Sequence, residues 1–239
     1  MTRSRDSQAS PVAKSRPETP ENRVSGRTRP AGELSGWVAG VLASIRDDAP
    51  ADVPCDGCTA CCRSSQFIHV TPDDADAVAH IPSALLFPAP GLPAGHYVLG
   101  YDERGHCPML VDDRCSIYEH RPNTCRTYDC RVFAATGIDV TDEKPLVAAR
   151  VREWRFDESG PAARRTASAL EAAARYLAER SGDLPAGTVP VDPTQRAVLA
   201  IDVHDMFVTS PEPSPETVAV AITQRRAGGY GRDDADAGA

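Results

Sequence analysis

The eight cysteines of this 239-residue chain fall into two short segments, and the rest of the chain contains none. The first segment, here the first knot, reads C-x2-C-x2-C-C, and the second knot reads C-x7-C-x9-C-x4-C. Thiols gathered this densely in a chain without a secretory signal are typical of metal ligands rather than of a disulfide framework. The sequence therefore predicts a thiolate-bound metal or iron–sulfur centre. Its candidate ligands are Cys55, Cys58, Cys61, Cys62, Cys107, Cys115, Cys125 and Cys130.

The overall composition argues against nucleic-acid-binding, membrane-spanning and secreted proteins. Hydrophobic residues make up 41% of the chain and aromatic residues only 5%, so a bound metal would add appreciably to a modest core. The net charge of −8 argues against nucleic acid as a partner. No apolar run reaches the roughly 18 residues of a membrane-spanning helix, and the N-terminus lacks the apolar stretch of a signal peptide. We therefore expect a cytoplasmic protein with no membrane contact, and the excess of Arg over Lys, with abundant Ala, indicates a bacterial source.

The sequence divides into a domain and two tails. Residues 1–30 are rich in Ser, Arg and Pro and are predicted to be a disordered basic tail, and residues 229–239 a second disordered tail. The predicted domain covers residues 31–228, with a metal-binding core at 53–132 and a helical C-terminal part at 144–228. The expected fold class is α+β: a small cysteine-rich metal-binding domain with a short hairpin and flanking helices.

Apolar spacing and turn residues place the expected elements. Helical periodicity runs from Leu34 to Ile45, and a strand is expected at 66–70, followed by a helix that ends near His80. Residues 96–101 and 108–111 flank a turn and are expected to pair as a hairpin. Four further helices are expected at about 146–154, 163–177, 192–207 and 214–228.

The spacing within the knots leaves two kinds of centre open. Three cysteines spaced C-x2-C-x2-C favour an iron–sulfur cluster, because bacterial ferredoxins use this spacing for [4Fe–4S]. Eight thiolates also supply two tetrahedral zinc sites. The side chains of Cys61 and Cys62 are expected to point apart, so that one serves each knot. The alternative is that one of them is a buried structural thiol.

Five further residues of the second knot carry a family resemblance: Ile117, Tyr118, Arg121, Pro122 and Arg126. Together with the cysteines, they complete the pattern C-x2-C-x2-C-C, then C-x7-C-x-I-Y-x2-R-P-x2-C-R-x3-C. Over residues 53–132 the chain resembles the YkgJ-type cysteine cluster family of zinc- or iron-chelating domains (CxxCxxCC). The resemblance implies a metal-binding domain. It does not extend to the methylase activity of related proteins, because we find no S-adenosylmethionine site in the sequence.

Residues beside the cysteines are candidates for contact with the centre. Arg121 and Arg126 could donate hydrogen bonds to sulfur or offset thiolate charge, and Tyr118 could shield the site from water. The alternative is ordinary packing, with the arginines on surface carboxylates and the tyrosine in the core. His106 and His120 could each replace a thiolate, although a histidine near a turn more commonly faces solvent.

The sequence therefore predicts a metal-binding protein that holds an iron–sulfur cluster, [4Fe–4S] being favoured, or zinc. An enzyme that uses this centre for redox or radical chemistry is a second hypothesis, with no catalytic residue identified. The third is a non-catalytic zinc-stabilised module for protein interaction. The sequence names no protein partner, and it contains no P-loop, G-x-G-x-x-G, H-E-x-x-H or G-x-S-x-G motif.

Overall fold

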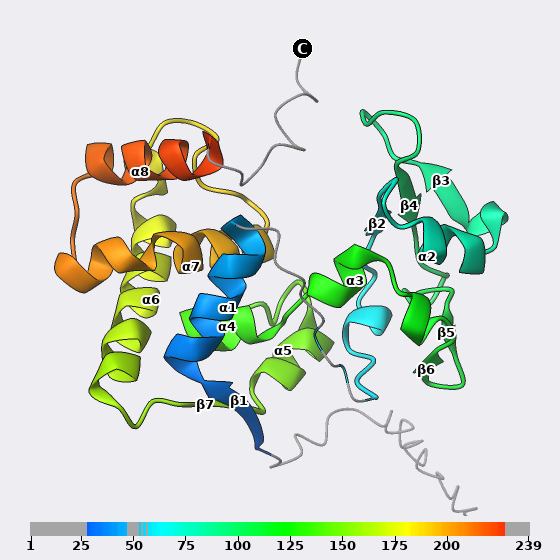
Figure 1. The fold of residues 1–239 in the computed structure, drawn as a ribbon, viewed down its shortest axis with the longest axis horizontal. Helices are drawn as coiled ribbons and strands as arrows, with labels where there is room; N and C mark the ends of the chain where they lie inside the picture. The colour runs from blue at the N-terminus through cyan, green and yellow to red at the C-terminus, as the bar shows by residue number, and fades with distance from the viewer. Residues whose placement is uncertain (1–27, 47–52, 54, 56, 228–239) are drawn as a thin grey trace, which may run out of the picture.

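The computed structural model describes residues 28–46, 53, 55 and 57–227. The longer helices gather in one half of the molecule together with β1 and β7, the other strands lie in the second half with α2 and α3, and the first knot lies between the halves (Figure 1). The fold is α+β, as the sequence predicts, and its cysteine-rich segment joins the two halves.

The helical half is built on the pair α6 and α7, with α8 packed on α7. Buried Ala and Leu side chains recur along α6 at helical spacing, and the small alanines let α7 approach closely. Asp192 caps α7, because its carboxylate accepts the Gln195 backbone N–H at 2.9 Å. The helices of this half are α1 (Leu34–Arg46), α4 (Arg131–Thr136), α5 (Pro145–Val151), α6 (Pro161–Glu179), α7 (Pro193–Thr209) and α8 (Pro215–Ala227).

The β half contains a three-stranded antiparallel sheet in the order β2-β4-β3 and a separate hairpin, β5–β6. Val70 and Leu99 from the sheet pack with Met109 and Ile117, and three cysteines of the second knot contact this small core. The elements are β2 (Ile68–Val70), α2 (Ala75–His80), β3 (Leu86–Pro88), β4 (Tyr97–Leu99), β5 (Leu110–Val111), β6 (Arg114–Cys115) and α3 (Asn123–Thr127).

A third, parallel pairing joins distant parts of the chain. Strand β1 (Arg29–Glu33) runs beside β7 (Trp154–Asp157), and Trp37 on α1 contacts Phe156 at a ring-centroid distance of 4.8 Å. Four single-turn 3₁₀ helices complete the described elements: η1 (Cys61–Arg63), η2 (Ser83–Leu85), η3 (Tyr118–His120) and η4 (Ser181–Asp183). Among the described residues, no helix is both long and apolar enough to cross a membrane.

The predicted hairpin is wrong. Strand β4 pairs with β2 and β3, and the hairpin is formed instead by β5 and β6, with Leu110 opposite Cys115. The reason lies in Asp112 and Asp113, whose φ angles of 48° and 59° suit a two-residue hairpin turn. Strand β3 lies in the Pro-rich segment between α2 and β4.

The helices agree better with expectation. The helix expected from Leu34 is confirmed as α1, and the three after residue 160 are confirmed as α6, α7 and α8. The helix expected at 146–154 ends at Val151, because Trp154 belongs to β7. Of the predicted tails, residues 1–27 and 228–239 lie outside the described residues, whereas Arg29 and Pro30 belong to β1.

Candidate metal centre

The first knot folds back on itself and then enters a helical turn. The Cys58 backbone N–H donates to the Cys55 carbonyl at 2.8 Å, and Gly57 between them has a φ of 71° that favours glycine. Cys61 and Cys62 begin η1. The two neighbouring thiols interact, and the interaction lowers the pKa of Cys61 and raises that of Cys62.

The second knot reaches the first through the backbone. The Cys107 N–H donates to the Cys62 carbonyl at 2.7 Å, so the two knots are joined directly beside their cysteines. The remaining three cysteines come from three separate elements: Cys115 ends β6, Cys125 lies on α3, and Cys130 is the N-cap of α4. Each is therefore held by regular backbone rather than by a long loop.

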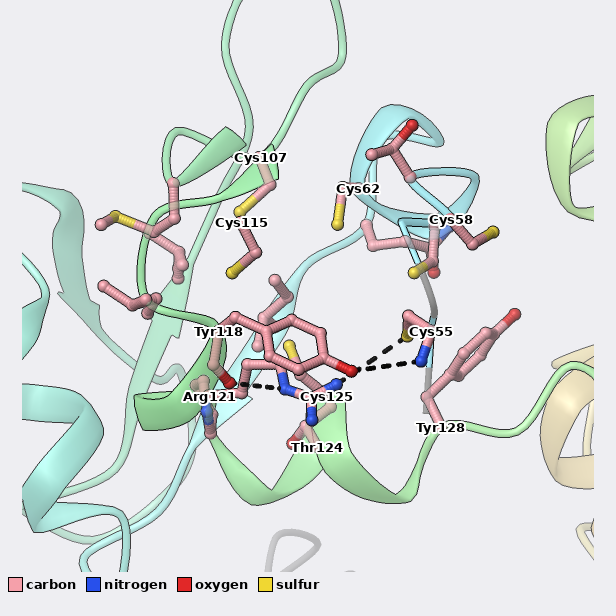
Figure 2. A pocket seen from close by; sticks show the side chains of 18 of the residues that line it. Cys55, Cys58, Cys62, Cys107, Cys115, Tyr118, Arg121, Thr124, Cys125 and Tyr128 are labelled. Atoms are coloured by element: carbon pink, nitrogen blue, oxygen red, sulfur yellow. Dashed lines mark hydrogen bonds between the residues drawn. The ribbon is translucent and has the colours of Figure 1, made fainter. Parts of the chain in front are cut away.

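Seven of the eight cysteines line one cavity of about 540 Å³. Figure 2 shows the side chains of Cys62, Cys107, Cys115 and Cys125 turned toward the same space. Apolar side chains complete the wall on the side of the β half, among them Leu99, Met109 and Ile117. The cavity is in the size range of small-molecule and cofactor sites.

The eighth cysteine, Cys130, lies in a second and smaller space. This cavity of about 50 Å³ is lined by Cys130 together with Cys55, Cys58 and Cys61, against α5 and β7. Electrostatics does not separate the thiols in this way. Beyond the effect of burial, charge on Cys61 raises the pKa of both Cys125 and Cys130; Cys107 and Cys115 add to the effect on Cys125, and Cys58 adds to the effect on Cys130.

The spacing of the sulfurs bears on which metal would fit. Four thiolates around one zinc ion at a Zn–S distance of about 2.3 Å lie about 3.8 Å from one another. Among the described residues, which include all eight cysteines, no three sulfurs lie within 4.8 Å of one another. The thiols thus surround a space instead of converging on a point, an arrangement that suits a centre of several metal atoms.

Two residues beyond the cysteine pattern donate to sulfur from the helical half. The Arg150 Nε–H lies 3.1 Å from the Cys58 sulfur, and the Trp154 indole N–H lies 3.3 Å from the Cys130 sulfur. Glu153 orients this arginine, because its carboxylate accepts from both Arg150 and Arg29 at 2.9 Å. Sequence reasoning missed both donors, because they follow the last cysteine by 20 residues or more and no local motif marks them.

Tyr118 and Arg121 lie at the cavity, as predicted. The Tyr118 hydroxyl accepts the Cys55 backbone N–H at 3.3 Å (Figure 2). The Arg121 guanidinium stacks 3.7 Å from the centroid of the Tyr118 ring, and its Nη1 lies 3.8 Å from the Cys55 sulfur. Only 7% of Arg121 is exposed, so its charge acts at short range on the nearby thiols.

Arg126 and the two candidate histidines have other surroundings. Arg126 donates to the backbone carbonyls of Arg121 and Glu119 and so braces the turn that precedes Cys125. His120 does not face the cysteines, because its Nδ1 pairs with Asp76 at 2.8 Å. The backbone N–H of His106 donates to Asp102 at 2.9 Å, and this residue is not among those that line either cysteine cavity.

The thiols differ in acidity in the metal-free protein. Burial raises the pKa of Cys55 and Cys130 to about 11 and that of Cys125 to about 12. The hydrogen bond from Cys62 has the opposite effect on Cys61 and lowers its pKa to about 7. The raised pKa values of Cys55, Cys125 and Cys130 favour protonated thiols, whose protons a metal must displace, whereas the lowered pKa of Cys61 favours its ionisation.

Comparison with known proteins gives one family match, and it covers the cysteine-rich segment. Residues 54–145 match the family model CxxCxxCC, which is described as a "putative zinc- or iron-chelating domain". No curated protein and no solved structure gives a significant match to the chain. The family match begins beside the first cysteine and ends before Arg150 and Trp154.

Proposed function

We propose that the chain binds an iron–sulfur cluster of the [4Fe–4S] class. The proposal starts from the match of residues 54–145 to the CxxCxxCC family of zinc- or iron-chelating domains. One observation carries this choice. Seven thiols from both knots surround a single cavity of about 540 Å³, and no three sulfurs approach as closely as one zinc ion requires. Thiolates that each bind a different iron of a cluster suit such a spread arrangement.

The proposed ligands of this cluster are Cys62, Cys107, Cys115 and Cys125. The support is that their side chains face the large cavity from the first knot, from the β half and from α3. Leu99, Met109 and Ile117 would exclude water behind the cluster. When bound, the cluster would supply one-electron redox chemistry, and the chain would set its potential through burial and nearby charge.

The other four thiols, Cys55, Cys58, Cys61 and Cys130, form a second group against the helical half. We propose that they bind a second metal centre. Support comes from Arg150 and Trp154, which donate to two of these sulfurs and would offset the charge of a metal–thiolate centre. Arg121, beside Cys55, adds a further positive charge, and Tyr118 holds the Cys55 backbone.

We propose that the protein binds its metal in the cytoplasm of a bacterium. The support is compositional: eight free thiols in one chain suit a reducing compartment, and the excess of Arg over Lys suits a GC-rich genome. The net charge of −8 favours a protein or small-molecule electron partner over nucleic acid.

Anaerobic purification tests the proposal directly. We expect brown protein with visible charge-transfer absorption that bleaches on reduction, and equal amounts of iron and acid-labile sulfide. About four irons per chain would assign one cluster and about eight would assign two. Colourless protein with stoichiometric zinc and no sulfide would overturn the proposal in favour of the zinc-stabilised module.

A further inference from the structure

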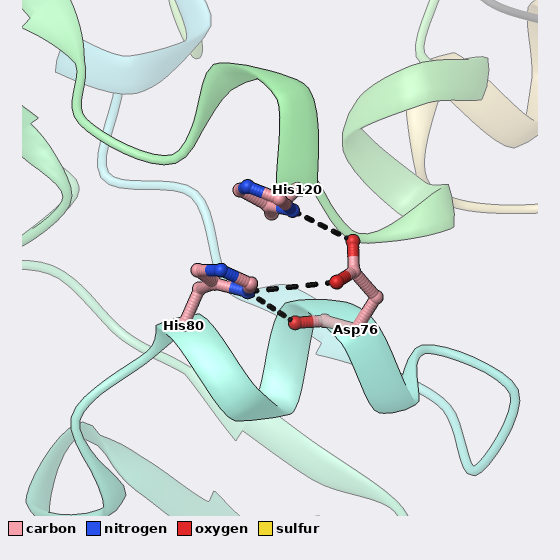
Figure 3. Close-up of side chains that lie close together, drawn as sticks. All are labelled: Asp76, His80 and His120. Atoms are coloured by element: carbon pink, nitrogen blue, oxygen red, sulfur yellow. Dashed lines mark hydrogen bonds and ion pairs between the residues drawn. The ribbon is translucent and has the colours of Figure 1, made fainter.

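A group of metal-ligating side chains lies outside the cysteine cavity, on the outer surface of the β half. Asp76 and His80 lie one turn apart on α2, and His120 reaches them from η3 (Figure 3). Their ligand atoms all lie within 4.8 Å of one another, and no other group of three His, Cys, Asp or Glu residues in the described part of the chain does so. The two imidazole rings stack at 3.5 Å with both Nδ1 atoms toward the carboxylate.

Other hydrogen bonds secure the backbone that flanks this group. Asp74, at the start of α2, accepts the Asn123 backbone N–H at 2.7 Å, and the Thr124 hydroxyl donates to the His69 carbonyl at 2.7 Å. These bonds join the segment before α2 to α3, which follows η3. The three exposed side chains therefore project from backbone that has further contacts of its own.

From these observations we propose that Asp76, His80 and His120 form a binding site for a divalent transition-metal ion such as Zn²⁺, Co²⁺ or Fe²⁺. Two imidazoles and one carboxylate suit these ions, and three protein ligands leave coordination positions for water. Exposed fractions of 66%, 41% and 39% for the three side chains give the ion direct access from solvent. The site is thus an exchangeable one, more open to solvent than the partly buried cysteines.

Binding requires a small rearrangement. A metal lies near the plane of each imidazole it binds, so the stacked rings must tilt toward the ion. His80 must also give up the contact of its Nδ1 with the Asp76 carbonyl at 2.8 Å. Each Nδ1 must present a lone pair to the ion, so each neutral ring carries its proton on Nε2 in the metal-bound state. Arg126, whose charge acts on Asp76, opposes a cation and limits the affinity.

The chain contains a matched control. His69 and His96 also stack, at a ring-centroid distance of 5.1 Å, but their ring nitrogens bond to each other at 3.0 Å. The described residues place no third ligand with this pair. Both histidine pairs therefore stack, whereas only the His80–His120 pair has a carboxylate beside it.

The test uses the full chain, purified anaerobically, after its own iron and zinc content has been measured. The protein is then titrated with Co²⁺ in competition with a chromophoric chelator. We expect one further equivalent of cobalt, with visible bands of nitrogen and oxygen ligation. His120→Ala and His80→Ala should lose this equivalent and Asp76→Asn should weaken it at least tenfold, whereas His96→Ala should retain it. Circular dichroism confirms folding.

Equal cobalt binding by His120→Ala and His96→Ala, or no further equivalent in the parent chain, overturns the proposal. The outcome is independent of the cysteine centre. If the iron–sulfur cluster is absent, cobalt can bind to the vacant cysteines instead. Such cobalt gives intense thiolate charge-transfer bands and remains bound in His120→Ala, so it is told apart from cobalt at the proposed site.

Discussion

On the side of the helical half, cysteine sulfurs receive hydrogen bonds from Arg150 and Trp154, whereas on the side of the β half the cavity wall is apolar, with Leu99, Met109 and Ile117. The first wall stabilises charge on sulfur, and the second excludes water and leaves room for a bound group. The polar wall lies beyond the segment that matches the family. The difference teaches that α5 and β7, which cover the core, also supply hydrogen-bond donors to the cysteines.

The largest expected effect separates the two cysteine groups. Cys125→Ser should remove the iron of the large cavity and the visible absorption which that iron gives, because Cys125 faces that cavity. Cys130→Ser should keep this absorption and lose only metal bound by the second group. Metal and sulfide content of both variants, with Met109→Leu as the control in the same wall, measures the difference. The reverse pattern would show that the assignment of the two groups is inverted.

The next effect concerns the helical half alone. Leu170 is fully buried on α6, and Leu170→Ala should lower the free energy of unfolding by about 2–5 kcal/mol. The variant that remains folded should keep its metal stoichiometry, because Leu170 lines neither cysteine cavity. Denaturant unfolding and metal analysis of the same sample check both parts. Loss of metal from folded protein would show that the helical core and the centre cannot be separated.

Removal of the sulfur donors should have a smaller effect. Hydrogen bonds to charged groups contribute about 1.5–3 kcal/mol, so Arg150→Met should speed metal loss to a chelator by about tenfold or more. Trp154→Phe, which removes a neutral donor, should have an effect of about fivefold. The matched control is Arg152→Met, because Arg152 donates to Thr141 and not to sulfur. Equal rates in Arg150→Met and Arg152→Met would mean that the polar wall has no influence on the centre.

The smallest effect is a dependence on pH. Because the thiols of Cys55, Cys125 and Cys130 have raised pKa values, metal uptake by the metal-free protein should become faster as the pH rises from 6.5 to 8.5. Stability of the metal-free fold should change in the opposite sense. These thiols ionise near pH 9 when unfolded but near 11–12 when folded, so their contribution is complete below pH 9 and is lost as the pH rises through the folded values. Anaerobic reconstitution between pH 6.5 and 8.5 checks the first trend, and unfolding of the metal-free protein above pH 9 checks the second. A flat profile in its own range would contradict the corresponding trend.

The helices and the cysteine pattern could be predicted from the sequence for local reasons. Apolar spacing identified α1 and α6, and the Asp192 cap identified the start of α7. The family followed from residue types at fixed spacing around the cysteines. Each of these signals lies within a short stretch of chain.

What could not be predicted depends on contacts between distant segments. The hairpin was misplaced because strands of two or three residues carry almost no periodic signal, and the left-handed Asp112–Asp113 turn decided the pairing. Arg150 and Trp154 approach sulfurs only because α5 and β7 pack beside the first knot. His120 was a candidate thiolate substitute, but the fold turns it outward to Asp76.

The most direct test of the central claim is X-ray absorption at the iron and zinc edges of anaerobically purified protein. The account predicts iron coordinated by sulfur with an iron–iron scattering shell, which only a polynuclear cluster produces, and loss of that shell in Cys125→Ser. Zinc surrounded by four sulfurs with no metal–metal shell, or iron without an iron neighbour, would contradict it.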